Sequence, residues 1–238
     1  MTNPNPAAYT VPGFVILRRW LLRTIFRGVF HALVKVKLVG WENIPSQGPY
    51  IIAHNHIALF EPPFILAFWP IAPEAVAGAD VFYRPWQSLL VRGYAAIPVH
   101  RDQYDRQVVE KMLQLLSAGR SLMIAPEGGR SHDLGLRRAR PGVAYIMDRA
   151  KVPVLPVGVV GSTDDMLARA FQGNRPTLEM RVGKPFMLPA IEGKGETRRA
   201  SRQENADAVM RQVAALLPAE FHGVYAGQVV GGGADSVG

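Results

Sequence analysis

The chain has 238 residues, which fits one domain or at most two small ones, because a domain usually takes about 100–200 residues. Its hydrophobic fraction of 48% excludes a disordered polar chain. The absence of cysteine excludes a disulfide scaffold, a thiolate metal site and any covalent thioester on the protein. A formal net charge of +8 indicates an anionic partner, which could be nucleic acid, a membrane surface or a phosphorylated substrate.

The first predicted element is a helix over residues 14–34 with one narrow basic stripe. Arg19, Arg23 and Arg27 recur every four residues, and nearly all the remaining positions around the helix are apolar. A transmembrane span is not expected, because no uncharged run approaches ~18 residues. A cleavable signal peptide is not expected either, because arginines interrupt the apolar run.

We expect this helix to lie on a membrane surface, with its apolar side in the acyl region and its arginines toward anionic headgroups. The alternative is a helix packed on the domain core with its arginines facing water. Residues 1–60 contain six basic side chains and one acidic one, so most of the charge excess belongs to this end. Residues 1–38 are therefore predicted to form a membrane-facing arm, and the protein to be peripheral or monotopic at the cytoplasmic face of a membrane.

Beyond this arm, short apolar runs alternate with helical patterns. Strands are predicted over residues 50–53, 95–99, 121–125, 152–160 and 178–182. Helices are predicted from Pro62, over 107–118 and 141–152, and from a capping box at Ser201 and Glu204 to Leu217. This order predicts an α/β fold with a mixed, largely parallel sheet flanked by helices. The domain is expected over residues 39–226, followed by a flexible tail at 227–238.

Two histidines and a carboxylate follow the strand predicted at residues 50–53. His54, His56 and Glu61 lie where the strand turns toward a helix, which is where α/β folds place their sites. Because Glu61 precedes a proline at the helix start, its carboxylate can fold back onto the His56 imidazole. A carboxylate on one imidazole nitrogen leaves the other nitrogen as a general base. The pair equally fits a purely structural hydrogen bond, and His54 is expected to be structural.

A glycine turn follows the strand predicted at residues 121–125. It contains Glu127, Gly128, Gly129 and Arg130. The glycines permit close backbone approach to a ligand, and the arginine offers a planar fork for phosphate. By itself this segment also fits an ordinary turn.

Together the two loops resemble the glycerolipid acyltransferase family, which is typified by the 1-acylglycerol-3-phosphate acyltransferases. Asn55 and His56, followed by Glu61, are similar to the family's first block, in which Asn-His and four further residues precede an Asp. Three further segments resemble the second block, the Pro-Glu-Gly-Thr-Arg-Ser block and the proline-rich strand block, at residues 93–101, 126–131 and 152–157.

The resemblance implies transfer of an acyl group from acyl-CoA or acyl-carrier protein to the hydroxyl of a lysophospholipid, with 1-acylglycerol-3-phosphate giving phosphatidic acid. His56 would be the general base and Glu61 would orient it. No metal would be needed, and no cofactor beyond the acyl donor. The acceptor would be held by Arg101, Glu127, Gly128, Gly129 and Arg130.

The chain departs from the family pattern at Glu61 and Gly129, at Ala58, where a small polar residue is usual, and in lacking a Lys shortly before Arg101. Glu61 stands where the family has Asp, which leaves open a different lipid acceptor or a catalytically inactive lipid-binding relative. Gly129 replaces a Thr and removes a hydroxyl from the acceptor loop. Nucleic acid is the least favoured partner, because the chain has no zinc-ligand spacing and no aromatic-rich basic strand.

Overall fold

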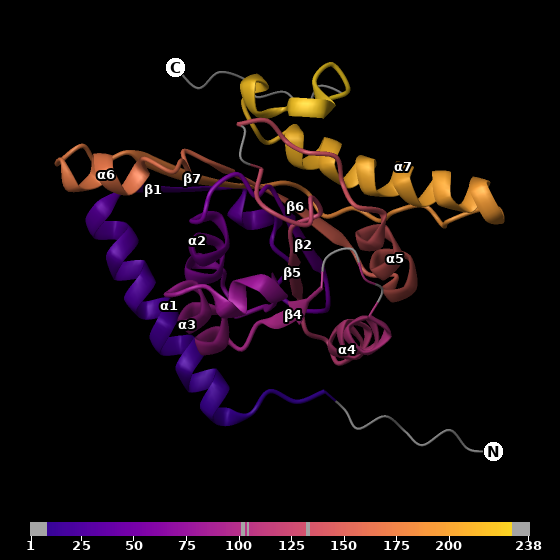
Figure 1. The fold of residues 1–238 in the computed structure, drawn as a ribbon, viewed down its shortest axis with the longest axis horizontal. Coiled ribbons are helices and arrows are strands. Elements are labelled where there is room, and N and C mark those ends of the chain that lie inside the picture. The colour runs from indigo at the N-terminus through magenta and orange to yellow at the C-terminus, as the bar shows by residue number, and fades with distance from the viewer. Residues whose placement is uncertain (1–8, 101–102, 104, 132–133, 230–238) are drawn as a thin grey trace.

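A seven-stranded sheet in the order β1-β7-β6-β2-β5-β3-β4 runs through the centre of the computed structural model, which describes residues 9–100, 103, 105–131 and 134–229 (Figure 1). All neighbouring strands are parallel except β6 and β7, which are antiparallel. The mixed, largely parallel sheet expected from the sequence is therefore confirmed. The strands are β1 Lys35–Val39, β2 Ile51–His54, β3 Glu74–Gly78, β4 Ile97–Val99, β5 Leu122–Ile124, β6 Val154–Val160 and β7 Thr177–Val182.

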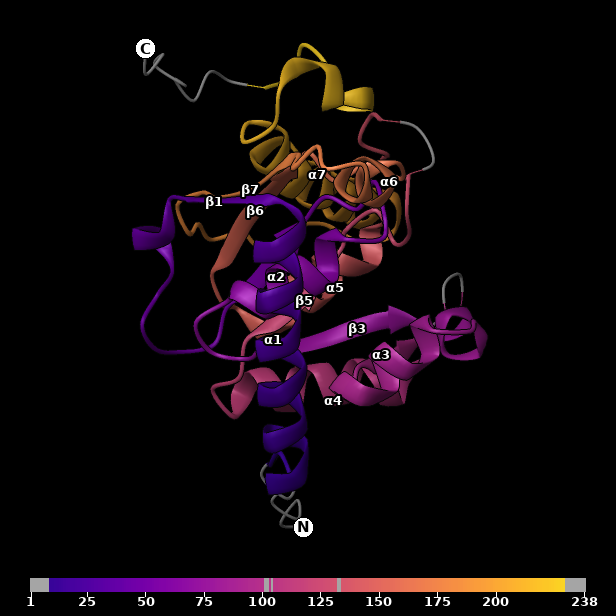
Figure 2. The same cartoon turned by 90° about the vertical axis from the view of Figure 1, so that its left-hand side faces the viewer.

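Helices cover both faces of the sheet, as Figures 1 and 2 show. Side chains alternate between the faces along a strand, so Ile51 and Ala53 join one apolar core while Ile52 joins the other. One face carries α1 Gly13–Leu33, α2 Glu61–Phe68 and α3 Gln87–Tyr94, and the other carries α4 Arg106–Ser117, α5 Pro141–Ala150 and α7 Gly195–Ala214. The shorter helices are α6 Met166–Phe171 and the 3-10 turns Trp41–Asn43, Ala79–Tyr83, Ala219–Phe221 and Gly223–Tyr225.

Two strands, one helix start and two helices that were not expected, α3 and α6, differ from the sequence-based expectation. β1 carries two lysines and lies at the sheet edge, and β3 consists largely of small residues, so neither shows the pattern of a buried strand. The capping box predicted at Ser201 is wrong, because α7 begins at Gly195. The first turns of α7 are mostly exposed and polar, and they carry no apolar period that would mark a helix. The division at residues 38 and 226 stays a prediction: β1 spans the first position, and residues 230–238 lie outside the described part.

The arginine stripe of α1 faces the protein, which corrects both orientations expected from the sequence. Arg23 donates hydrogen bonds to the backbone oxygens of Leu66, at 2.8 Å, and of Trp69. Arg27 donates to the backbone oxygen of Ala67 at 2.6 Å. These oxygens belong to the last turn of α2 and the residue just after it, where a helix supplies no N–H partners of its own. Two arginines of the stripe therefore cap α2.

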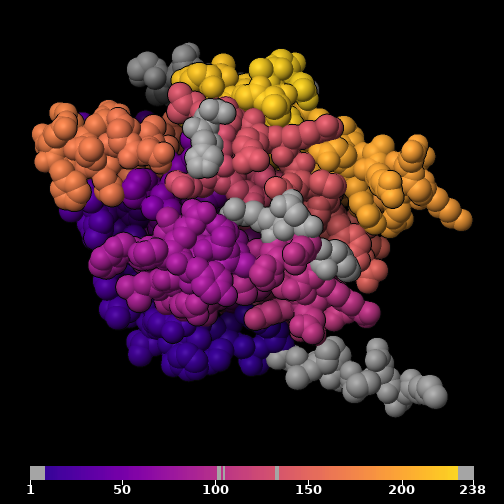
Figure 3. Space-filling model, viewed as in Figure 1, coloured from indigo at the N-terminus to yellow at the C-terminus, as the bar shows by residue number. Residues whose placement is uncertain are grey.

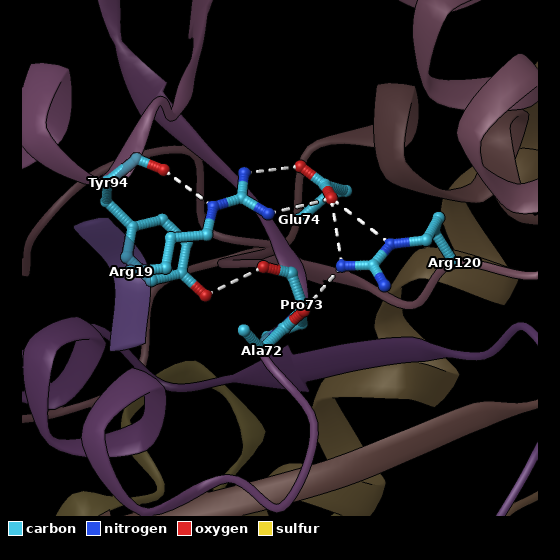
Figure 4. A network of polar contacts seen from close by, with 6 residues as sticks. All are labelled: Arg19, Ala72, Pro73, Glu74, Tyr94 and Arg120. Carbon is cyan, nitrogen blue, oxygen red and sulfur yellow. Dashed lines mark hydrogen bonds and ion pairs between the residues drawn. The ribbon is translucent and has the colours of Figure 1, made fainter. Parts of the chain in front are cut away.

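Arg19 lies buried in a polar network that joins α1 to β3 (Figure 4). Its guanidinium donates to both carboxylate oxygens of Glu74, at 2.9 and 2.6 Å, and to the backbone oxygen of Tyr94 at 2.8 Å. Arg120 donates to the same carboxylate at 3.2 Å. Burial raises the pKa of Glu74, but the bonds from Arg19 and the charge of Arg120 outweigh it and hold this pKa below its ordinary value. The network fixes α1 to the domain.

The apolar side of α1 faces solvent. Figure 2 shows α1 in front of the sheet, and Figure 3 shows it in indigo along one edge of the molecule. None of the helices in the described ranges is both long and apolar enough to cross a membrane. The exposed side chains, between 43% and 67% accessible, are Phe14, Ile16, Leu17, Trp20, Leu21, Ile25 and Val29, called the apolar face of α1 below.

Candidate active site

The loops after β2 and β5 meet at one edge of the sheet because these strands are parallel neighbours. The N–H of Ser131 donates to the backbone oxygen of His56 at 2.8 Å. The N–H of His56 in turn donates to the carboxylate of Glu127 at 2.9 Å. The two loops singled out in the sequence therefore form one site.

His56 and Glu61 are paired at the centre of this site. Glu61 Oε2 lies 3.3 Å from His56 Nδ1, and Oε1 accepts the N–H groups of Ile57 and Ala58 at 3.2 and 2.7 Å. Because a carboxylate accepts, Nδ1 holds the imidazole proton and Nε2 has a free lone pair. Nε2 makes no hydrogen bond with any described residue. The geometry is the one expected from the sequence, whereas the catalytic role stays a prediction.

Asn55 holds the histidine loop against β6 in a way that sequence reasoning did not assign. Its side-chain amide donates to the backbone oxygen of Val159 at 3.0 Å and accepts the N–H of Val159 at 2.7 Å. This pairing continues the β2–β6 ladder by one side chain. Its sequence signal is the amide directly before His56, which the family resemblance includes without giving it a role.

His54 is buried beside His56, with ring centroids 6.0 Å apart. Its Nδ1 donates to the backbone oxygen of Asn55 at 2.7 Å. Burial, helped by the nearby His56, lowers the pKa of His54 to about 3, so His54 is neutral. Its hydrogen bond fits the structural role expected for it.

Glu127 binds backbone groups from both sides of the site. Its carboxylate accepts the N–H of His56 and the N–H of Arg137, each at 2.9 Å. Burial raises the pKa of Glu127 to about 7, although these two N–H groups act in the opposite direction. The carboxylate therefore fixes the shape of the loop, and contact with an acceptor stays a prediction.

The glycine turn places Arg130 at the same site. Gly128 has φ +72°, a backbone conformation that favours glycine, and a Cβ there would displace the side chain of Arg140. Gly129 follows in the same turn. Arg130 is partly buried, with Nη1 3.9 Å from a carboxylate oxygen of Asp164.

A cavity of about 700 Å³ opens beside His56, between the sheet edge and helices of both layers. His54, His56, Gly128 and Arg130 form part of its wall. Most of its remaining wall is apolar and comes from α3, α4, α5 and the strand ends, including Leu90, Val91, Val108, Val109, Met112, Met123, Val143 and Ile146. Such a cavity suits a ligand with a long apolar part.

A comparison with models of known protein families shows to which family the chain belongs. A family model described as Acyltransferase matches residues 35–160 of the chain. The chain belongs to the acyltransferase family. This confirms the resemblance that the two loops carry.

Individual proteins with sequences similar to this acyltransferase-family chain are also named acyltransferases. A 1-acyl-sn-glycerol-3-phosphate acyltransferase of Saccharomyces cerevisiae is 25% identical over 185 residues, covering 74% of this chain and 60% of the relative. The chloroplastic 1-acyl-sn-glycerol-3-phosphate acyltransferase BAT2 of Brassica napus is 25% identical over 161 residues, covering 66% of this chain and 46% of the relative. The chain thus spans about half the length of these curated relatives.

A solved structure shares the fold. The crystal structure of the 1-acyl-sn-glycerophosphate acyltransferase PlsC from Thermotoga maritima superposes with a TM-score of 0.58 at 22% sequence identity. The match covers 83% of this chain and 86% of that chain.

Two site predictions for this acyltransferase-family chain remain open. Arg101, expected to hold the acceptor phosphate, lies outside the described residues. Within the described ranges there is no group of three or more His, Asp or Glu side chains suited to a metal ion. That the reaction needs no metal or added cofactor stays a prediction.

Proposed function

We propose that this chain transfers an acyl group from acyl-CoA or acyl-carrier protein to the hydroxyl of a lysophospholipid, with 1-acylglycerol-3-phosphate giving phosphatidic acid. The observation that carries the proposal is the position of His56, on the cavity wall with Nδ1 facing Glu61 at 3.3 Å. The family match and the names of the relatives support acyl transfer and this acceptor.

The proposed chemistry is general base catalysis by His56. Nε2 removes the proton of the acceptor hydroxyl while its oxygen attacks the thioester carbonyl. Glu61 keeps the imidazole in the required tautomer and stabilises the imidazolium that forms. The carbon–sulfur bond then breaks, and the thiolate takes the proton from His56. Arg130, with Arg101, holds the phosphate of the acceptor.

The apolar part of the cavity supports this proposal because an acyl chain is stabilised when it is buried against an apolar wall, away from water. Removal of apolar surface from water contributes about 25 cal/mol per Å². Both substrates carry an acyl chain, and the apolar wall lies beside His56. An acyl group held there would have its carbonyl near the base.

We also propose that α1 places the protein peripherally or monotopically on a membrane, at the cytoplasmic face. Its apolar face is exposed, which supports insertion of these side chains among lipid acyl chains. The arginines of the stripe bind Glu74 and the end of α2, so they do not supply the attraction to anionic headgroups expected from the sequence. The proposed binding therefore depends on apolar contact.

A thioester-consumption assay with acyl-CoA and 1-acylglycerol-3-phosphate tests the proposed reaction. His56→Ala is expected to lower the rate by about 100-fold or more, since general base catalysis contributes that much. His31→Ala, on the exposed surface of α1, is the matched control and should leave the rate unchanged. Equal rates for wild type and His56→Ala would overturn the proposal. Binding of the acceptor without any thioester consumption would support the inactive lipid-binding alternative.

A further inference from the structure

Arg202 of α7 belongs to the wall of the same cavity, although it lies far beyond the segment that matches the family model. Its guanidinium carbon sits 5.1 Å from the centroid of the Tyr145 ring, and Tyr145 also lines the cavity. Stacking on an aromatic face holds the planar guanidinium in one orientation. The proposed reaction assigns nothing to this pair.

The guanidinium of Arg202 has hydrogen-bond donors that no described residue accepts. Its Nε is buried without a hydrogen-bond partner, and the side chain makes no hydrogen bond or ion pair with any described residue. Two other arginines of the wall lie near carboxylates, Arg84 at 2.6 Å from Asp80 and Arg130 at 3.9 Å from Asp164. A buried donor without a partner costs free energy, so its persistence points to a ligand that completes it.

The surroundings of Arg202 favour an anion. Among the described residues that line the cavity, Asp105 contributes the one carboxylate, and that carboxylate accepts the N–H groups of Gln107 and Val108 at 2.9 and 3.2 Å. The wall is therefore basic. The guanidinium fork matches a phosphate group, which it can bind through two parallel hydrogen bonds.

The side chain of the residue after Arg202 fixes this part of α7, and the first turn of α5 leaves open space in the same cavity. The next residue, Gln203, donates to the backbone oxygen of Ala139 at 3.0 Å, which ties α7 to the segment before α5. Gly142, in the first turn of α5, also lines the cavity, and a Cβ there would meet no atom within 4 Å. The positive end of α5 adds to the attraction but would not by itself make a site.

We propose that Arg202, stacked on Tyr145, binds a phosphate group of a substrate at this wall of the cavity. The phosphate belongs either to the acyl donor, as in CoA, or to the phosphomonoester of the acceptor. The identity of these substrates rests on the proposed function, whereas the anion site rests on the contacts of Arg202.

Calorimetric titration of the full chain tests this site without requiring turnover. The donor probes are CoA, 3′-dephospho-CoA and pantetheine, and the acceptor probes are 1-acylglycerol-3-phosphate and 1-acylglycerol. Arg202→Gln is compared with wild type and with Arg199→Gln, because Arg199 is exposed on the same helix and does not line the cavity. Arg202→Gln is expected to weaken binding of the phosphate-bearing donors or of the phosphate-bearing acceptor by about ten-fold or more, as for a lost bond to a charged group. Binding of the matching phosphate-free probe and all binding by Arg199→Gln should stay unchanged.

The proposal is overturned if Arg202→Gln binds every probe as wild type does, or weakens phosphate-bearing and phosphate-free probes equally. If Arg202→Gln does not fold, Arg202→Lys is judged by the same criteria, since it keeps the charge and loses the planar stack. A wild type that consumes no thioester but binds phosphate through Arg202 would refute the proposed function and leave this inference standing.

Discussion

Glu61 reaches the His56 imidazole from the first residue of α2, although the family block has the shorter Asp at this position. The longer side chain is accommodated because its other oxygen accepts two backbone N–H groups of the loop, from Ile57 and Ala58. These bonds fix the carboxylate while it faces Nδ1. The departure from the family pattern is therefore compatible with an oriented histidine.

For this residue pair we predict that Glu61→Gln lowers the turnover number by about 100-fold with little change in KM, because it removes the charge that stabilises the imidazolium. Glu61→Asp should retain more activity than Glu61→Gln, since it keeps the carboxylate. Steady-state kinetics over a range of acceptor concentrations checks both variants. Equal turnover by Glu61→Gln and wild type would show that the pair is only structural.

Glu127 gives a pH-dependent prediction. Its pKa is raised from 4.5 to about 7 by burial, so the folded protein keeps a proton that the unfolded chain releases. Stability from this group is complete below pH 4.5 and is lost as the pH rises to about 7, by on the order of 3 kcal/mol. Urea unfolding of wild type and Glu127→Gln across this range should show the difference between them changing in that direction. A difference independent of pH would contradict the prediction.

At the scale of elements, α1 is held by polar contacts on one side while its apolar side remains exposed. Arg23 and Arg27 satisfy backbone oxygens at the end of α2, and Arg19 bonds to Glu74 at the start of β3. Phe30 adds an apolar contact, packing edge-on against Phe64 of α2 at 5.1 Å. Removal of residues 1–34 would therefore damage the domain, and substitutions on the exposed face are the better test of α1.

Arg19→Leu is predicted to lower the free energy of unfolding by about 3 kcal/mol, because it leaves a buried carboxylate with less compensation. The double variant Arg19→Leu, Glu74→Leu should recover part of this loss, since no unpaired carboxylate remains. Urea denaturation measures both. A change below about 0.5 kcal/mol, as for an exposed pair, would show that the pair does not anchor α1.

The apolar face of α1 gives a prediction for membrane binding. Trp20→Ser with Leu21→Ser should reduce flotation with phospholipid vesicles several-fold, because both side chains are at least half exposed. Met187→Ser with Val224→Ser, also exposed but away from α1, is the matched control. Zwitterionic vesicles should also bind wild type, since insertion of the apolar face does not depend on the arginine stripe, which is engaged within the protein. Binding to anionic vesicles alone would contradict this account.

At the scale of the whole molecule, the cavity combines elements that no single segment of the chain contains. α3 from one helical layer, α4 and α5 from the other, and the ends of several strands form its wall. We predict that Leu90→Trp shifts the preference among acyl donors toward shorter chains, because it fills part of this space. Leu89→Trp, at an exposed position outside the cavity wall, should leave the preference unchanged. Rates with a series of saturated acyl-CoA donors check both variants, and equal shifts would refute the assignment.

The fold class and the His56 and Glu61 pair were predictable from the sequence because both depend on local order. Strand and helix periods identify most elements within short windows, and Glu61 lies close enough along the chain to fold back onto His56. β1 and β3 were not predicted, because β1 lies at the sheet edge and β3 has small side chains. Such segments form strands only when neighbouring strands pair with them.

Local residue patterns were enough to predict the family, the α/β class and the pairing of one imidazole with one carboxylate. The direction in which the arginines of α1 point could be read only from the folded chain, because their partners lie 40 or more residues away along the chain. The same holds for Arg202, whose stacking partner Tyr145 is on another helix. A residue pattern shows that side chains share one face of a helix, but the contacts made by that face depend on which distant groups the fold brings to it.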